Sequence, residues 1–227
     1  MAQSFSPRLG ILPPPQRRLW DELAEVPSEF VLYGGTALAL HLGHRQSVDF
    51  DFFSDSPLDE RQLVPAIPFL EAATVTQRAP NTLSCVVDRG GVVKVAFFGL
   101  PWLTHIAPPL VAPDNGLQVA SLLDIAAKAS VVQQRAEAKD YLDIAALLTS
   151  GVDLPTVLAA GRAVHGAQFN PQSTLKALSY FEDGNLRRLP EPVKDRLRQA
   201  VRDVDLDRLP ALSATGRSGR HDRGGAS

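Results

Sequence analysis

Between residues 30 and 53 the chain reads FVLYGGTALALHLGHRQSVDFDFF. The run 30–33 is short and apolar and is closed by Gly34 and Gly35, which is typical of a buried strand that ends in a tight turn. The residues that follow, from Thr36 onward, are rich in helix formers. Residues 47–53 alternate between polar and apolar side chains, as a half-buried strand does. The order predicted for this stretch is therefore strand, glycine turn, helix and strand.

An acidic pair, Asp49 and Asp51, lies in the second of these strands. Side chains alternate along a strand, so the two carboxylates share one face while Phe50 and Phe52 point to the other. Their α-carbons would be about 6.5 to 7 Å apart, which allows both carboxylates to bind one hard cation or to bridge two. Because two like charges this close repel each other, we expect Mg²⁺ or Mn²⁺ at the pair.

The glycine pair before the helix suggests a phosphate site. Gly34 and Gly35 let backbone approach a phosphate closely, and the free N–H groups of the following helix attract an anion. Thr36 would either cap the helix or contact the phosphate. Each pattern by itself is also common as a plain turn or a solvated acidic face. Together, in this order and spacing, they predict a site for a nucleotide and a metal ion.

The remaining sequence predicts an α/β core followed by helices. A hairpin is expected from the strands 82–87 and 92–98. The stretch 101–116 is rich in turn-forming residues, and no strand is expected beyond it. We predict a mixed sheet with flanking helices over residues 1–115, a C-terminal helical region over 116–212 and a disordered tail over 213–227. The expected helices span residues 16–24, 58–71, 119–134, 137–148, 170–181 and 191–209.

Composition narrows the class of protein. The chain has 227 residues, of which 44% are hydrophobic and 21% are charged, so a wholly disordered chain is excluded. Its net charge of −2 does not indicate a protein that binds DNA non-specifically over its whole surface. Cys85 is the only cysteine, which is typical of a reducing compartment. No apolar run is long enough for a signal-peptide core or a membrane span. We therefore expect a cytoplasmic protein with no membrane contact.

Two groups of residues also carry a family resemblance. Residues 32–38 (LYGGTAL) and 45–53 (RQSVDFDFF) resemble the first motif of the AbiEii/AbiGii branch of the nucleotidyltransferase superfamily. Residues 122–128 (LLDIAAK), Arg135 and residues 139–147 (KDYLDIAAL) are similar to its lysine-bearing helix and its basic-Asp-x-x-Asp helix. The resemblance spans residues 29–150.

The resemblance implies a polymerase-β-like nucleotidyltransferase fold. It also implies metal-dependent transfer of a nucleoside monophosphate from an NTP to a hydroxyl, with tRNA or another RNA end as the favoured acceptor. A toxin role in type IV toxin–antitoxin or phage-defence modules, with a cognate antitoxin as partner, is part of the same expectation. The expected catalytic residues are Asp49, Asp51, Lys128 and Asp140, the first two as metal ligands. The expected nucleotide- or phosphate-binding residues are Gly34, Gly35, Thr36, Arg45, Ser47 and Lys128.

Several of these residues have a second interpretation. Lys128 would either offset charge on the triphosphate or form a plain helical ion pair with Asp124, four positions earlier. Arg45 would either contact phosphate or pair with an aspartate. Asp143 shares a helical face with Asp140, and we expect its carboxylate to be solvated. The histidines at 41 and 44 are expected to be surface residues, since no third ligand stands at zinc spacing.

One departure from the superfamily pattern bears on catalysis. These enzymes usually take a third carboxylate from a later strand, and Ala96 stands where that acid would be. Asp88 or Asp140 would replace it, or a single metal ion would bind, or the protein would be a catalytically impaired nucleotide-binding or interaction module. A transferase acting on a protein or small-molecule hydroxyl, and a metal-dependent phosphatase or glycosyltransferase that uses the acidic pair, are the enzymatic alternatives.

Overall fold

The computed structural model describes residues 5–132 and 137–216. Its strands form one mixed sheet in the order β3-β4-β5-β2-β1-β7-β6. The strands are β1 Val31–Tyr33, β2 Asp49–Ser54, β3 Thr74–Ala79, β4 Thr82–Asp88, β5 Val92–Gly99, β6 Leu110–Val111 and β7 Gln118–Val119. The α-helices are α1 Pro14–Leu19, α2 Gly34–Leu42, α3 Glu60–Ala66, α4 Pro68–Glu71, α5 Leu122–Ala129, α6 Ala138–Thr149, α7 Leu154–His165, α8 Pro171–Leu178 and α9 Glu191–Arg202. Short 3-10 turns occupy Leu9–Ile11, Trp20–Glu25, Gly166–Gln168, Leu186–Arg188 and Leu206–Arg208.

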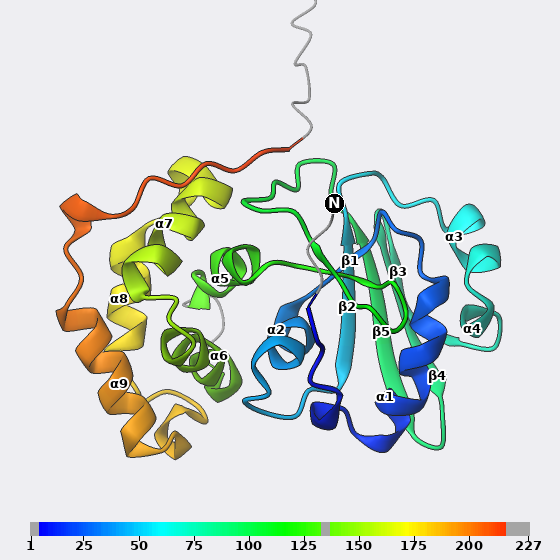
Figure 1. Ribbon diagram of the computed structural model, residues 1–227, viewed down its shortest axis with the longest axis horizontal. Helices are drawn as coiled ribbons and strands as arrows, with labels where there is room; N and C mark the ends of the chain where they lie inside the picture. The colour runs from blue at the N-terminus through cyan, green and yellow to red at the C-terminus, as the bar shows by residue number, and fades with distance from the viewer. Residues whose placement is uncertain (1–4, 133–136, 217–227) are drawn as a thin grey trace, which may run out of the picture.

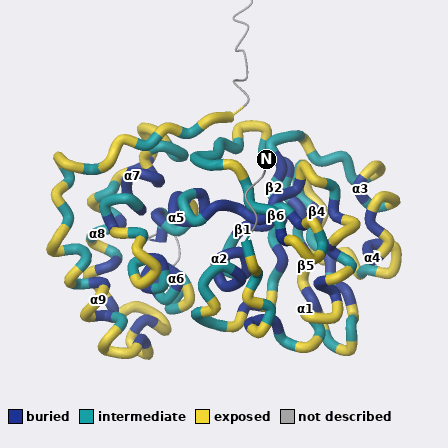
Figure 2. The backbone as a smooth tube through the Cα atoms, viewed as in Figure 1, coloured by how far each residue is buried: buried dark blue, intermediate teal, exposed yellow. Residues whose placement is uncertain are grey.

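The elements are arranged in two halves with α2 between them. Figure 1 shows the sheet with α1, α3 and α4 on its outer side, and α5 to α9 gathered on the other side of α2. The segment that leads from the sheet into α5 is buried at Val119, Ala120 and Ser121, and Figure 2 shows it running between the two halves. The expected α/β core followed by C-terminal helices is confirmed.

The centre of the sheet follows from the two strands of residues 30–53. All three residues of β1 are buried, because β1 lies between β2 on one side and β7 on the other. In β2 burial alternates, with Phe50 and Phe52 at 0% exposure. The ring of Phe52 stacks on that of Phe97 of β5 at 5.1 Å between centres. One face of β2 is thus core, and the other carries the acidic pair.

The helix α2 begins directly at Gly34 and ends at a left-handed glycine. Gly43 has a φ of +67°, and its N–H donates to the carbonyl of Ala39 at 2.7 Å, which closes the last turn. Because the glycine stops the helix there, residues 44–48 return the chain to the sheet as a loop. That loop carries His44, Arg45 and Ser47 back over the N-terminus of the helix.

Several predicted elements differ from the structure. The prediction of no strand beyond residue 116 is wrong, because β7 extends the sheet there, and β6 lies within the stretch 101–116 that was expected to be rich in turns. Each of these strands has two residues, too few for a periodic pattern. β3 was also missed, since every residue of this edge strand is exposed and it has no apolar face. The predicted helix 58–71 breaks at Ile67, before Pro68, because a residue that precedes proline disfavours the helical conformation.

Differences continue in the C-terminal half. α7 was missed, although Asp153 caps it by accepting a hydrogen bond from the Thr156 N–H and a proline follows in its first turn. The predicted tail is described as far as Gly216, and Thr215 pairs with His105 through two backbone hydrogen bonds of 2.7 and 2.8 Å. That part of the tail is therefore not disordered, while residues 217–227 and Arg135 lie outside the described residues.

None of the described helices alone is long and apolar enough to cross a bilayer. The helices at 138–149 and 154–168 reach the required length and apolarity only as a pair, and they are bent by 115° where they meet.

Candidate active site

The acidic pair lies at the wall of a cavity between the two halves. Asp49 and Asp51 are both half-buried and face a cavity of about 460 Å³, called here the carboxylate cavity. Asp51 is in register with Tyr33 of β1 and with Ala96 of β5. The sheet therefore presents the pair from its central strand. Across the cavity from the sheet, α5 contributes Lys128, and α6 contributes Lys139, Asp140 and Asp143.

The glycine pair allows backbone to meet this cavity at close range. Gly34 has a φ of +77°, and a β-carbon there would lie 3.2 Å from Oδ2 of Asp51. A β-carbon at Gly35 would lie 2.2 Å from Nη2 of Arg45 and 3.3 Å from Oδ2 of Asp143. Both positions are thus kept free of side chains by charged groups. The N-terminus of α2, with its free N–H groups, opens onto the same space.

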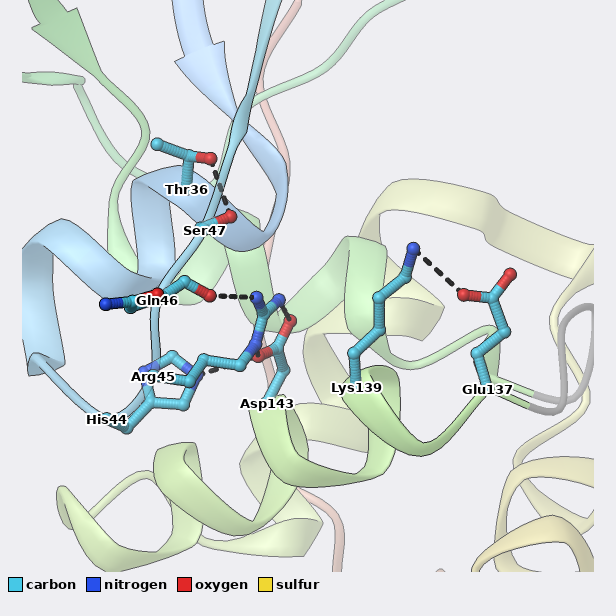
Figure 3. A network of polar contacts seen from close by, with 8 residues as sticks. All are labelled: Thr36, His44, Arg45, Gln46, Ser47, Glu137, Lys139 and Asp143. Atoms are coloured by element: carbon cyan, nitrogen blue, oxygen red, sulfur yellow. Dashed lines mark hydrogen bonds and ion pairs between the residues drawn. The ribbon is translucent and has the colours of Figure 1, made fainter. Parts of the chain in front are cut away.

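Thr36 and Ser47 tie the start of α2 to the start of β2. The Thr36 hydroxyl is hydrogen-bonded to the Ser47 hydroxyl at 2.7 Å and to the carbonyl oxygen of Asp49; Figure 3 shows the contact between the two hydroxyls. Thr36 is 2% exposed and Ser47 is 8% exposed. These bonds hold Asp49 beside the helix N-terminus. Phosphate contact by either hydroxyl stays a prediction.

Asp143 is the centre of a buried ionic cluster. Its carboxylate accepts hydrogen bonds from Nε and Nη2 of Arg45 at 2.6 and 2.8 Å, and Nε2 of His44 lies 2.7 Å away. Figure 3 shows the three side chains converging from the loop after α2 and from α6. The expectation that Asp143 is solvated is therefore wrong. The cluster joins the two halves beside the cavity.

The charge on Arg45 is secured by this environment. Burial by itself would lower the pKa of Arg45, but the hydrogen bonds and attraction of Asp143, with smaller contributions from Asp140 and Asp49, raise the pKa overall. Of the two interpretations of Arg45, the pairing with an aspartate is the one that the structure contains. Arg45 also lines the carboxylate cavity, so the guanidinium still contributes positive charge there.

The two histidines expected at the surface have internal partners. Nε2 of His41 lies 2.9 Å from the carbonyl oxygen of Ala120, and its ring stacks on Phe5 at 4.6 Å. Burial lowers the pKa of His41, and the bond to Ala120 offsets part of that effect. Nδ1 of His44 is buried and has no hydrogen-bond partner among the described residues. No sequence signal distinguished His44 from a surface residue.

Lys128 is placed by α5 at the edge of the cavity. Its Nζ lies 3.4 Å from the ring centre of Phe53 and 5.7 Å from that of Tyr33, so both rings stabilise the cation. Asp124, the partner in the ion-pair interpretation, accepts hydrogen bonds from the backbone N–H groups of Ile106 at 2.7 Å and Ala107 at 3.3 Å. It is only 4% exposed, so the carboxylate holds the loop before α5 in place.

The third carboxylate remains absent from the sheet. Ala96 is directly opposite Asp51, and Asp88 is engaged at the far hairpin, where it accepts hydrogen bonds from Gly90 and Gly91 at 2.9 and 3.0 Å. Asp88 does not line the carboxylate cavity, whereas Asp140 does.

Over residues 5–132 and 137–216 no group of three or more His, Cys, Asp or Glu side chains is arranged to hold a metal ion. Mg²⁺ usually binds through one or two protein carboxylates and completes its shell with water and substrate phosphate oxygens. The donor set of Asp49 and Asp51 fits that pattern.

Comparison with known proteins identifies the family of this chain. Residues 18–215 match the family model described as "Nucleotidyl transferase AbiEii toxin, Type IV TA system". The chain belongs to the AbiEii family of nucleotidyltransferase toxins. The AbiEii match extends beyond the resemblance of residues 29–150 and includes α7, α8 and α9. The last three helices are therefore part of the AbiEii unit.

Individual proteins are similar to this chain in sequence or in fold. An uncharacterised protein of Aquifex aeolicus (strain VF5) is 31% identical over 160 residues, which covers 69% of this chain and 75% of that protein. MenT4, a nucleotidyltransferase toxin from Mycobacterium tuberculosis H37Rv, has a similar fold with a TM-score of 0.56 and 16% identity, covering 84% of each chain. A candidate nucleotidyltransferase from H. pylori has a TM-score of 0.50 and 17% identity, covering 83% of this chain and 90% of that one.

Proposed function

We propose that this AbiEii protein transfers a nucleoside monophosphate from an NTP to an acceptor hydroxyl, with Mg²⁺ or Mn²⁺ bound at Asp49 and Asp51. The observation that carries the proposal is the convergence of these two carboxylates, a helix N-terminus freed by Gly34, and Lys128 on one cavity. An anionic triphosphate and a divalent cation need these opposite charges side by side. A site for a neutral substrate would not require both negative and positive groups at the same cavity.

The chain's own residues then have distinct roles. Gly34 and Gly35 let the N–H groups of α2 approach the phosphates, and Lys128 offsets charge on the departing pyrophosphate. The acceptor oxygen forms a bond to the α-phosphorus as the bond from that phosphorus to the β-phosphate oxygen breaks, and pyrophosphate leaves. Asp140, which lines the carboxylate cavity from α6, takes the proton of the acceptor hydroxyl. When bound, Mg²⁺ supplies neutralisation of the phosphate charge at Asp49 and Asp51.

The acceptor and the partners belong to the same proposal. We place the reaction in the cytoplasm with tRNA or another RNA end as acceptor, and a cognate antitoxin as the protein that restrains it. The description of the AbiEii family, a toxin of a type IV toxin–antitoxin system, supports an antitoxin partner. A hydroxyl of a protein or of a small molecule is the alternative acceptor.

The test is transfer of label from α-³²P-labelled ATP, GTP, CTP and UTP to bulk tRNA in the presence of Mg²⁺. Asp49→Asn and Asp51→Asn should each lower the rate by about 100-fold or more while the melting temperature stays unchanged or rises, because charge repulsion is removed. Asp55→Asn is the matched control, since Asp55 follows the same strand and does not line the cavity. Equal labelling by wild type and the Asp49 and Asp51 variants would refute the proposal.

A second candidate is a nucleotide-binding module without catalysis. The position of Ala96 directly opposite Asp51 favours it, because a superfamily acid is missing at that point. In this case Mg²⁺-dependent binding of NTP would be measured without any labelled product, on RNA or on protein.

A further inference from the structure

A second cavity adjoins the carboxylate cavity on the far side of Lys128. It has a volume of about 190 Å³ and is enclosed by the end of β1, the loop after β5, α5 and the C-terminal end of α7. Phe53 and Lys128 line both cavities, so the two meet at these side chains. We call this second space the aromatic cavity, because the rings of Tyr33, Phe53, Trp102 and His165 contribute to its wall.

The wall of the aromatic cavity is suited to a flat ring with a polar edge. An apolar cavity of about 150 Å³ is known to accept one benzene ring, so about 190 Å³ holds a single planar ring system. Nucleobases stack on aromatic side chains whatever their sequence. The three phosphates of the same nucleotide would lie in the carboxylate cavity, where Lys128 and the N-terminus of α2 provide positive charge.

One polar group of this wall lacks a partner. Oγ1 of Thr104 is buried and has no hydrogen bond within the described part of the chain. Its neighbours are satisfied: Tyr33 Oη is bonded to Nδ1 of His105 at 2.8 Å, and Nε2 of His165 lies 3.1 Å from the carbonyl oxygen of Ala127. Because a buried hydroxyl normally has a partner, a polar atom of a ligand would complete the hydrogen bonding of Thr104.

We propose that the aromatic cavity binds the base of the substrate NTP and that Thr104 contributes to the choice of base. This inference rests on the proposed function, since it extends the same nucleotide from the carboxylate cavity past Lys128. Lys128 lies where the triphosphate and base would adjoin, which is consistent with its position against the faces of Phe53 and Tyr33.

Trp102 supports a stacking role at the rim. It is 70% exposed, although tryptophan is usually among the more buried side chains. A base in the cavity would cover part of this exposed ring. The other tryptophan, Trp20, is 0% exposed and bonded to Asp114 at 2.7 Å, so a change in fluorescence on binding would report on Trp102.

The experiment compares wild type with Trp102→Ala and Thr104→Val in the presence of Mg²⁺. KM and kcat are measured for ATP, GTP, CTP and UTP, and tryptophan fluorescence is titrated with each NTP and with inorganic triphosphate. Tyr180→Ala is the matched control, because Tyr180 is an aromatic residue with 51% exposure that lines neither cavity. Trp102 is exposed and Thr104→Val keeps the side-chain shape, so both variants should fold.

The expected result is a KM for the preferred NTP that rises about tenfold or more in Trp102→Ala, with kcat changed by less than about threefold. In Thr104→Val the ratio of KM values between bases should change by about two- to tenfold. Inorganic triphosphate should bind both variants as it binds wild type.

Unchanged KM values in both variants, with NTPs binding no better than inorganic triphosphate, would overturn the inference while leaving the proposed function intact. If wild type neither binds nor transfers any of the four nucleotides, the proposed function fails and this inference fails with it.

Discussion

Replacing Asp143 by asparagine should destabilise the protein, because the change leaves a buried guanidinium without its counter-charge. The side chains of Asp143 and Arg45 are 11% and 19% exposed, and two hydrogen bonds of 2.6 and 2.8 Å join them. Removal of one partner of a buried ion pair costs about 3 to 5 kcal/mol. His44, 2.7 Å from the same carboxylate, also loses its charged partner.

That cost is large compared with the total stability of a domain, about 5 to 15 kcal/mol. In a chain of this size, 1 kcal/mol lowers the melting temperature by about 2 to 4 °C, so the expected decrease is about 6 to 20 °C. The double variant Arg45→Met/Asp143→Leu should recover most of the loss, since no buried charge remains unpaired.

Urea and thermal unfolding, followed by circular dichroism, measure the effect directly. Asp195→Asn is the matched control: Asp195 pairs with Arg198 at 2.9 Å, but the side chains are 70% and 40% exposed, so the loss should stay below about 1 kcal/mol. If Asp143→Asn costs no more than this exposed pair, the ionic cluster does not hold the two halves together. A normal melting temperature with lost transfer activity would instead give Asp143 a direct role in the reaction.

Three further outcomes are expected. Gly34→Ala should lower the free energy of unfolding by about 1 to 2 kcal/mol, because the φ of Gly34 is +77°. It should also lower Mg²⁺-dependent transfer, because the new β-carbon would lie 3.2 Å from Oδ2 of Asp51. Gly116→Ala is the control: its φ is +74° and no atom lies near the new β-carbon, so thermal melts should show only the loss of stability. Burial lowers the pKa of His41, so folding favours the neutral ring. The stability that His41 contributes is present above the unfolded pKa of about 6.5 and should be lost as the pH falls below it. Urea unfolding at pH 7.5 and 5.5 should therefore show a smaller difference in stability in His41→Gln than in wild type. Ala96→Asp should destabilise the metal-free protein by repulsion with Asp51 and increase its thermal stabilisation by Mg²⁺, and a wild-type response to Mg²⁺ would contradict a shared site.

Local pattern was enough to predict the centre of the fold. The alternation of residues 49–53 and the glycine pair produced β2 and the start of α2 within two residues, because both depend on side chains adjacent in sequence. β7 could not be predicted in this way, since its two residues join the sheet by pairing with β6 and with Leu32 of β1, which is distant in sequence. For α7, in contrast, the sequence does contain a local signal, since the N-cap residue Asp153 is followed by a proline in the first turn of the helix.

The site shows the same division between local and distant information. The acidic pair and the glycines were identifiable because their spacing along the chain determines their placement. The hydrogen bonds between Asp143 and Arg45 join residues that are 98 positions apart. No local sequence pattern could therefore predict that Asp143 is buried in an ion pair while Asp140 lines the cavity. The aromatic cavity depends on α7, which was not predicted, and its wall therefore could not be assembled from sequence.

The pairing of Thr215 with His105 has a consequence for how the protein matures. These residues are 110 positions apart, and the segment at 215–216 packs against Thr104, where a β-carbon at Gly216 would lie 2.9 Å from the threonine methyl group. Translation must therefore pass residue 215 before this contact can form. A chain that stops before residue 215 would contain the acidic pair but would lack the segment that packs against Thr104 at the wall of the aromatic cavity.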